Sequence, residues 1–88
     1  IPGLVISNLN PAVLAQYGLP LSSHGVVVEN PGDIGARAGL RPGDVLSGVN
    51  GEAVDTVADV DRALRGAGRR LALEVQRGTQ RVVMRFRL

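Results

Sequence analysis

The chain has 88 residues, of which 44% are hydrophobic and 20% charged, a balance typical of a globular domain. It has no cysteine, so disulfides and thiolate metal sites are excluded, and its single histidine and scattered carboxylates offer no ligand cluster, so we expect no metal site. The net charge is +2 and all basic residues are arginines dispersed along the chain without interleaved aromatics, which argues against a nucleic-acid partner. No apolar run reaches the ~18–20 residues of a membrane span, so we expect no membrane insertion.

Turn and capping residues divide the first half of the chain into short elements. Asn10 is a good N-cap, Pro11 suits the first helical position, and Gly18 is a suitable helix terminator. A valine-rich run ends at Asn30-Pro31-Gly32, a strong turn signal. We therefore expect, in order, a strand at 4–9, a helix at 11–17, a strand at 25–29 and one or two helical turns at 34–38.

The second half is expected to contain the long helix and a terminal hairpin. Thr56 followed by Asp59 resembles a capping box, and Gly68 is the expected end of that helix. The last strand alternates apolar and polar positions, so its core face is expected to carry Val82, Met84, Phe86 and Leu88. The expected elements are strands at 44–49 and 52–54 joined by the Asn50-Gly51 reversal, a helix at 57–67, and strands at 71–77 and 80–88.

Three segments together carry a resemblance to a known family. Residues 25–28 (Gly-Val-Val-Val), 36–46 (Ala-Arg-Ala-Gly-Leu-Arg-Pro-Gly-Asp-Val-Leu) and 49–51 (Val-Asn-Gly) resemble the core signature of bacterial PDZ domains. Residues 2–6 and 9–10, followed by a short helix, are similar to the opening segment of PDZ domains in HtrA/Deg serine proteases of the DegP/DegQ type. The resemblance implies a β-rich α+β fold: five to six strands in a partly open barrel, one long and one or two short helices, and the circularly permuted bacterial strand order.

The resemblance also implies a function. Such a domain captures C-terminal or extended peptide segments by strand addition, and it would serve as the substrate-recognition or regulatory domain of a periplasmic or cell-envelope serine endoprotease. Its partners would then be unfolded-protein C-termini and its own protease domain in cis, without a cofactor and without catalysis by this chain. The alternative is an interaction or assembly module of another parent: a secretion-system component, a site-2 metalloprotease or a carboxyl-terminal processing protease. Because the sequence begins at Ile1 without methionine, we expect residues 1–88 to be a single domain of a longer protein.

The candidate peptide-binding residues lie on two segments. An open strand edge offers backbone N–H and C=O groups to an added strand, and the Gly3 turn lets backbone amides converge on a terminal carboxylate. Pro2 has no N–H, so this loop has one donor fewer than its length suggests. By the resemblance, the groove-facing positions of the helix are at i, i+4 and i+7, whereas Val60, Ala63 and Ala67 face the core. The predicted site comprises Ile1, Pro2, Gly3, Leu4, Val5, Ile6, Val57, Asp61 and Leu64.

Other polar residues invite functional interpretations that their context does not favour. His24 with Ser22, Ser23 and Asp33 contains the residue types of a catalytic triad, but no nucleophile motif frames them, so a solvated loop is expected. Asp44 after Pro42-Gly43 is expected to be a turn or capping carboxylate. For Asp61 two interpretations stay open: a ligand-selecting groove residue, or an exposed helix acid paired with Arg65 at i+4.

Overall fold

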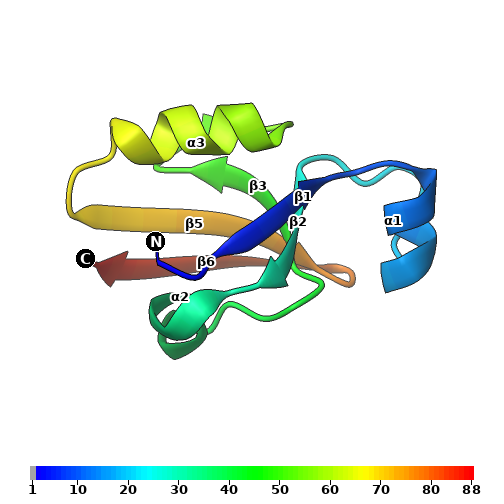
Figure 1. Ribbon diagram of the computed structural model, residues 1–88, viewed down its shortest axis with the longest axis horizontal. Coiled ribbons are helices and arrows are strands. Elements are labelled where there is room, and N and C mark those ends of the chain that lie inside the picture. The colour runs from blue at the N-terminus through cyan, green and yellow to red at the C-terminus, as the bar shows by residue number, and fades with distance from the viewer. Residues whose placement is uncertain (1) are drawn as a thin grey trace.

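The computed structural model describes residues 2–88 and contains one antiparallel sheet with three helices around it (Figure 1). The strands lie in the order β1-β2-β3-β5-β6, and β4 pairs with β3 off this path, so β1 and β6 form the two edges of the path. This is the β-rich α+β architecture expected from the sequence. The elements are β1 (Val5–Asn8), α1 (Pro11–Tyr17), β2 (Val26–Asn30), α2 (Gly32–Ala38), β3 (Val45–Val49), β4 (Glu52–Ala53), α3 (Val57–Arg65), β5 (Arg70–Arg77) and β6 (Gln80–Arg87).

The core lies between the sheet and α3 and consists of aliphatic side chains, as the scarcity of aromatics requires. Strand β2 contributes a run of fully buried valines, and β5 alternates buried and exposed positions in the register expected for a strand with one core face. On β6, Met84 is buried, and Val82 and Phe86 are half-buried against the core. The prediction for Leu88 was wrong: the strand ends at Arg87, and Leu88 remains 46% exposed because no neighbour covers its side chain there.

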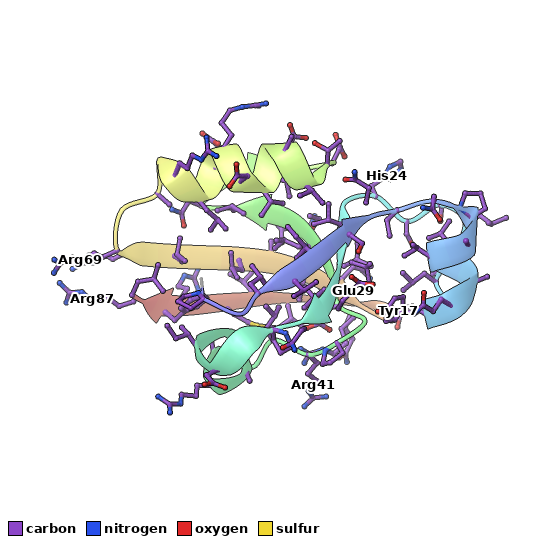
Figure 2. All side chains as sticks on the ribbon, viewed as in Figure 1. Tyr17, His24, Glu29, Arg41, Arg69 and Arg87 are labelled. Carbon is purple, nitrogen blue, oxygen red and sulfur yellow. The ribbon has the colours of Figure 1, made fainter. Side chains whose placement is uncertain are left out.

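Helix α1 begins and ends where its capping residues predict. The Val13 N–H donates to Oδ1 of Asn10 at 2.9 Å, and Gly18 adopts a left-handed conformation (φ 64°) at the C-cap. The helix lies at the opposite end of the molecule from the C-terminus (Figure 1), and its Tyr17 side chain points back toward the sheet (Figure 2). The two capping residues therefore set the start and the end of α1.

Helix α3 begins at the predicted capping box but ends two residues early. The Thr56 hydroxyl accepts from the Asp59 N–H at 3.1 Å, and the Asp59 carboxylate accepts from the Thr56 N–H at 3.2 Å. The predicted end at Ala67 was wrong, because Gly66 is the C-cap and the Ala67 N–H already bonds the Leu64 carbonyl in a tighter turn. Gly66 is a poor helix residue, and it stops the helix before Gly68 is reached.

Asp44 is the buried carboxylate of the core, only 2% exposed. It accepts from the Arg41 N–H at 2.9 Å, which confirms the turn role expected from the sequence. It also forms a bidentate ion pair with Arg77 of β5: Nε donates to Oδ1 at 2.8 Å and Nη2 to Oδ2 at 2.7 Å. The hydrogen bonds to Asp44 raise the pKa of Arg77 above its ordinary value, so the guanidinium stays charged.

Candidate functional site

A groove of ≈ 440 Å³ runs between the edge strand β1 and helix α3. Figure 1 shows α3 above the sheet and β1 below the helix, crossing in front of the other strands. Strand β1 pairs only with β2 in the part of the chain that the structure describes, so its other edge carries backbone groups without a strand partner. An unpaired strand edge beside a helix is the arrangement that accepts an added peptide strand.

The groove is mainly apolar, and five residues predicted from the sequence meet there. Two come from β1 and its approach and three from one stripe of α3: Leu4, Ile6, Val57, Asp61 and Leu64. The four apolar ones are half-buried against the core, which leaves part of each side chain open to a ligand. Val5 has the opposite parity and its side chain is 47% exposed outside the groove, so only its main chain faces an added strand.

Two lining residues, Ala58 and Val60, were not predicted as part of the groove. Val60 is fully buried, as expected for a core position, but it also forms part of the groove floor. Ala58 lies three residues before Asp61 on the same helical face, so the i, i+3 spacing could have identified it. Both present small apolar surface between the larger side chains.

The loop at one end of the groove rests directly on the first residue of α2. Pro2 and Gly3 form a turn before β1, and Gly3 has a φ of 78°. The Gly3–Gly32 approach is so close that a Cβ on Gly3 would lie 3.3 Å from the Gly32 Cα. Backbone packing therefore fixes the position of the predicted carboxylate loop. Ile1 lies outside the described residues.

A hydrogen bond joins β1 to α3 beside Val57, one of the residues that line the groove. The Val57 N–H, the first of the helix, donates to Oδ1 of Asn8 at 2.7 Å. This bond satisfies one of the free N–H groups at the helix start and ties the helix to the last residue of β1. The sequence analysis did not identify Asn8, because the contact joins residues 49 positions apart. Asn8 thus sets the separation of the two groove walls beside Val57.

Asp61 is the one charged residue among the described residues that line the groove. Asp61 pairs with Arg65 at 2.7 Å, and both side chains are exposed, so the pairing anticipated at i+4 is present while Asp61 also lines the groove. Such an exposed pair is weak and exchangeable in water. Near the helix start, the hydrogen bond from the Asp55 N–H, with others from Thr56, holds the pKa of Asp59 below its usual value.

The residues of the suspected triad do not come together. His24, Ser22 and Ser23 lie in the loop before β2, Asp33 lies on α2, and no hydrogen bond among the described residues links His24 to either serine or to Asp33. Figure 2 shows His24 near the start of α3, away from α2. Within residues 2–88 no group of three or more metal-ligating side chains gathers. None of the described helices has the length and apolar character needed to cross a membrane.

Comparison with known families and proteins gives a consistent result. A family model described as PDZ domain matches residues 25–77. The periplasmic serine endoprotease DegP of Escherichia coli (strain K12) is 39% identical over 82 residues, covering 91% of this chain and 17% of that protein. A putative zinc metalloprotease of Brucella suis is also 39% identical, over 64 residues that cover 72% of the chain and 17% of that protein.

A solved structure supports the same fold. The HtrA-type protease AlgW, determined with a decapeptide, superposes with a TM-score of 0.79 at 26% sequence identity, covering 97% of this chain and 27% of that one. The chain spans less than a fifth of the curated relatives that it matches. The match between fold, motif and relatives therefore concerns one module of much longer proteins.

Proposed function

The chain belongs to the PDZ domain family, and from that premise we propose that it binds extended or C-terminal peptide segments in the groove between β1 and α3. The ligand adds as a strand to the free edge of β1 and places alternate side chains against α3. The observation that carries this proposal is the unpaired edge of β1 beside an apolar groove. The proposed contact residues are Pro2, Gly3, Leu4, Val5, Ile6, Val57, Asp61 and Leu64.

Each part of the groove supports a different part of ligand recognition. Apolar Val57 and Leu64 favour apolar ligand side chains at alternate positions, because burying such groups is worth about 1.5–3 kcal/mol each. The Pro2-Gly3 turn is placed to receive a ligand C-terminus, with the N–H groups of Gly3 and Leu4 as the available donors. Internal extended segments compete well with free C-termini in this scheme, because Pro2 supplies no N–H.

The wider biological role follows from the relatives. In this proposal residues 1–88 are a single recognition domain of a longer envelope or periplasmic serine endoprotease, in which the domain presents unfolded-protein termini to a protease domain in cis. The name of the Escherichia coli relative supports this parent and this compartment. The second candidate is a metalloprotease parent in which the same module binds peptides, and the similarity to a putative zinc metalloprotease is the observation that supports it.

A substitution in the groove tests the binding proposal. Leu64→Arg places a guanidinium on the apolar wall and should weaken binding of a peptide ending in alternating apolar residues by about fivefold or more, since the lost apolar contact is worth about 1–3 kcal/mol. Leu21→Arg is the matched control, because Leu21 is 87% exposed in a distant loop. Calorimetric titration of both folded variants measures the effect; unchanged affinity in Leu64→Arg would refute the groove assignment.

The gene segment upstream of Ile1 separates the two candidate parents. A trypsin-like domain with a Gly-Asn-Ser-Gly-Gly nucleophile motif is expected for the serine protease. A membrane-embedded zinc-binding motif in its place would favour the metalloprotease. This comparison leaves the peptide-binding test unaffected, so the two parts of the proposal can fail separately.

A further inference from the structure

A cluster of unpaired arginines lies at the open end of the β5–β6 hairpin, opposite its turn and away from the groove. The basic patch, as we define it, comprises Arg69, Arg70, Arg85 and Arg87, all of them exposed. Among residues 2–88 none of the four forms an ion pair, whereas Arg62, Arg65, Arg77 and Arg81 each pair with a carboxylate. Figure 2 shows Arg69 and Arg87 projecting together from this end of the molecule. The patch therefore concentrates positive charge that the chain itself does not neutralise.

Repulsion between the arginines of the basic patch destabilises the hairpin. Arg70 of β5 lies directly opposite Arg87 of β6, and like charges at such cross-strand positions destabilise a sheet. Further along the same face, Glu74 neutralises Arg81, so the hairpin does compensate charge at one place. The other half of the face has no such acid.

Protection of an open sheet edge explains only part of the patch. Arginines on β6 can discourage edge-to-edge pairing, because β6 is an edge strand. Arg70 lies on β5, whose backbone is occupied on both sides there: its carbonyl accepts from Nδ2 of Asn50 at 3.2 Å, and the Ala72 N–H donates to Oδ1 of Asn50 at 2.7 Å. A charge at a position without a free edge needs a different explanation.

The patch also surrounds a hollow. A depression of ≈ 350 Å³ is lined by Asn50, Arg70, Leu71, Ala72, Arg85, Phe86 and Arg87. Among its apolar residues, half-buried Ala72 lies on the same face of the hairpin as Arg70, Arg85 and Arg87, whereas the side chains of Leu71 and Phe86 point to the core face; Ala72 therefore lies at the floor and the guanidinium groups form the rim. A concave site of this kind receives a side chain and does not insert into a bilayer. No exposed aromatic ring is present within it for stacking on a base.

We propose that the basic patch is a second docking site, which binds an acidic protein segment whose carboxylates flank one apolar side chain. The arginines would hold the carboxylates in bidentate contacts, and the hollow would receive the apolar side chain. The site is separate from the peptide groove: its lining residues come from β5, β6 and the Asn50 turn, and none of them lines the groove. The domain could then hold a peptide and an acidic partner at the same time.

The test uses a fluorescent peptide, Asp-Glu-Leu-Glu-Asp, blocked at the N-terminus by its dye and amidated at the C-terminus, so that it has no free carboxylate end for the groove. Fluorescence anisotropy with the 88-residue chain should show binding that weakens about tenfold in Arg85→Gln/Arg87→Gln, since each exposed pair contributes modestly. The control Arg37→Gln/Arg41→Gln removes the same net charge from exposed residues on α2 and the following turn. It should leave the affinity unchanged.

A second variant and alternative probes complete the design. Ala72→Leu fills the hollow without changing charge and should also weaken binding, as should replacing the probe's leucine by serine. Peptide binding to the groove should remain unchanged in all patch variants. The proposal is overturned if the probe does not bind, or if both charge-matched variants lose affinity equally. It is also overturned if anionic phosphatidylglycerol vesicles or duplex DNA bind more tightly than the probe and depend on the same arginines.

Discussion

Gly32, the first residue of α2, supports the loop proposed to receive a ligand C-terminus. Its φ is 70°, and its N–H donates to Oδ1 of Asn30 at 2.9 Å. A Cβ added to Gly32 would clash with the Pro2 carbonyl oxygen and lie 3.0 Å from the Gly3 carbonyl carbon and 3.2 Å from the Leu4 nitrogen, one of the two proposed donors. Any side chain at Gly32 must therefore displace the backbone of this loop and that donor with it.

We expect Gly32→Ala to weaken binding of a free-acid peptide more than binding of the amidated peptide, because only the free acid uses the displaced donor. Gly68→Ala is the matched control: its φ is 66°, but nothing lies within 4 Å of an added Cβ. Both substitutions should incur the cost of a left-handed backbone at alanine, about 1–2 kcal/mol, and Gly32→Ala adds the clash with the loop. Titrations with the two peptides distinguish the effects, and equal losses in both variants would contradict the role assigned to Gly32.

Pro2 limits the same loop in a different way. Hydrogen bonds to a charged group contribute roughly 1.5–3 kcal/mol each, so a loop without the Pro2 donor should prefer a free acid over its amide by about tenfold or less. Pro2→Leu restores an N–H and should widen that preference. The titrations use a chain extended upstream of Ile1, since a free α-amino group at Ile1 would itself attract the carboxylate. A hundredfold preference already present in the unmodified chain would show that the loop is not limited by its donors.

At the scale of elements, local signals predicted most of the structure. Asn10 and the Thr56–Asp59 box located the starts of α1 and α3, and Gly18 located the end of α1, because these residues satisfy or terminate backbone hydrogen bonding within a few residues. The start of α2, expected at residue 34, lies at Gly32 and has no side-chain cap. The end of α3 was missed because Gly66-Ala67-Gly68 offers two possible stops that only the packed structure distinguishes. Helical spacing placed Val57, Asp61 and Leu64 on one face of α3, and the family resemblance assigned that face to the groove. Asn8 was not predicted, since no local pattern links β1 to α3.

The capping box makes the stability of α3 depend on pH. Because the pKa of Asp59 is lowered in the folded state, its carboxylate stabilises the fold above the unfolded-state pKa, and this contribution is lost as the pH falls through the folded pKa. Asp59→Asn should therefore be less stable than the unmodified chain at pH 7, with the difference vanishing in strong acid. Urea unfolding between pH 7 and pH 2.5 measures it. Glu52→Gln is the matched control, because it removes an exposed β4 carboxylate that makes no side-chain hydrogen bond among the described residues.

On the scale of the whole molecule, the Asp44–Arg77 pair joins parts of the chain that are distant in sequence. Arg77 at the end of β5 binds Asp44, the residue before β3, and its Nη2 also donates to the Gly39 carbonyl after α2 at 2.8 Å. One side chain thus links the terminal hairpin to the α2 region. Sequence analysis identified the Asp44 turn but not its partner 33 residues away, because only the folded sheet brings the two together.

Removing Arg77 should destabilise the whole domain. Arg77→Leu leaves the Asp44 carboxylate, only 2% exposed, without its cation, and breaking a buried pair in this way costs about 3 kcal/mol. In a domain of this size that corresponds to a fall of roughly 15 °C in Tm. Arg81→Leu is the control, since its pair with Glu74 is solvent-exposed and should contribute less than about 1 kcal/mol.

The double variant Asp44→Asn/Arg77→Leu identifies the cause of the loss. Asparagine removes the buried charge but keeps an oxygen that accepts from the Arg41 N–H, so part of the lost stability should return. Thermal and denaturant unfolding of the four chains supply the comparison. If Arg77→Leu and Arg81→Leu lose similar stability, or if the second substitution restores none, then the pair does not hold the hairpin to the α2 region. The stability of the fold would in that case rest on the aliphatic core between the sheet and α3 alone.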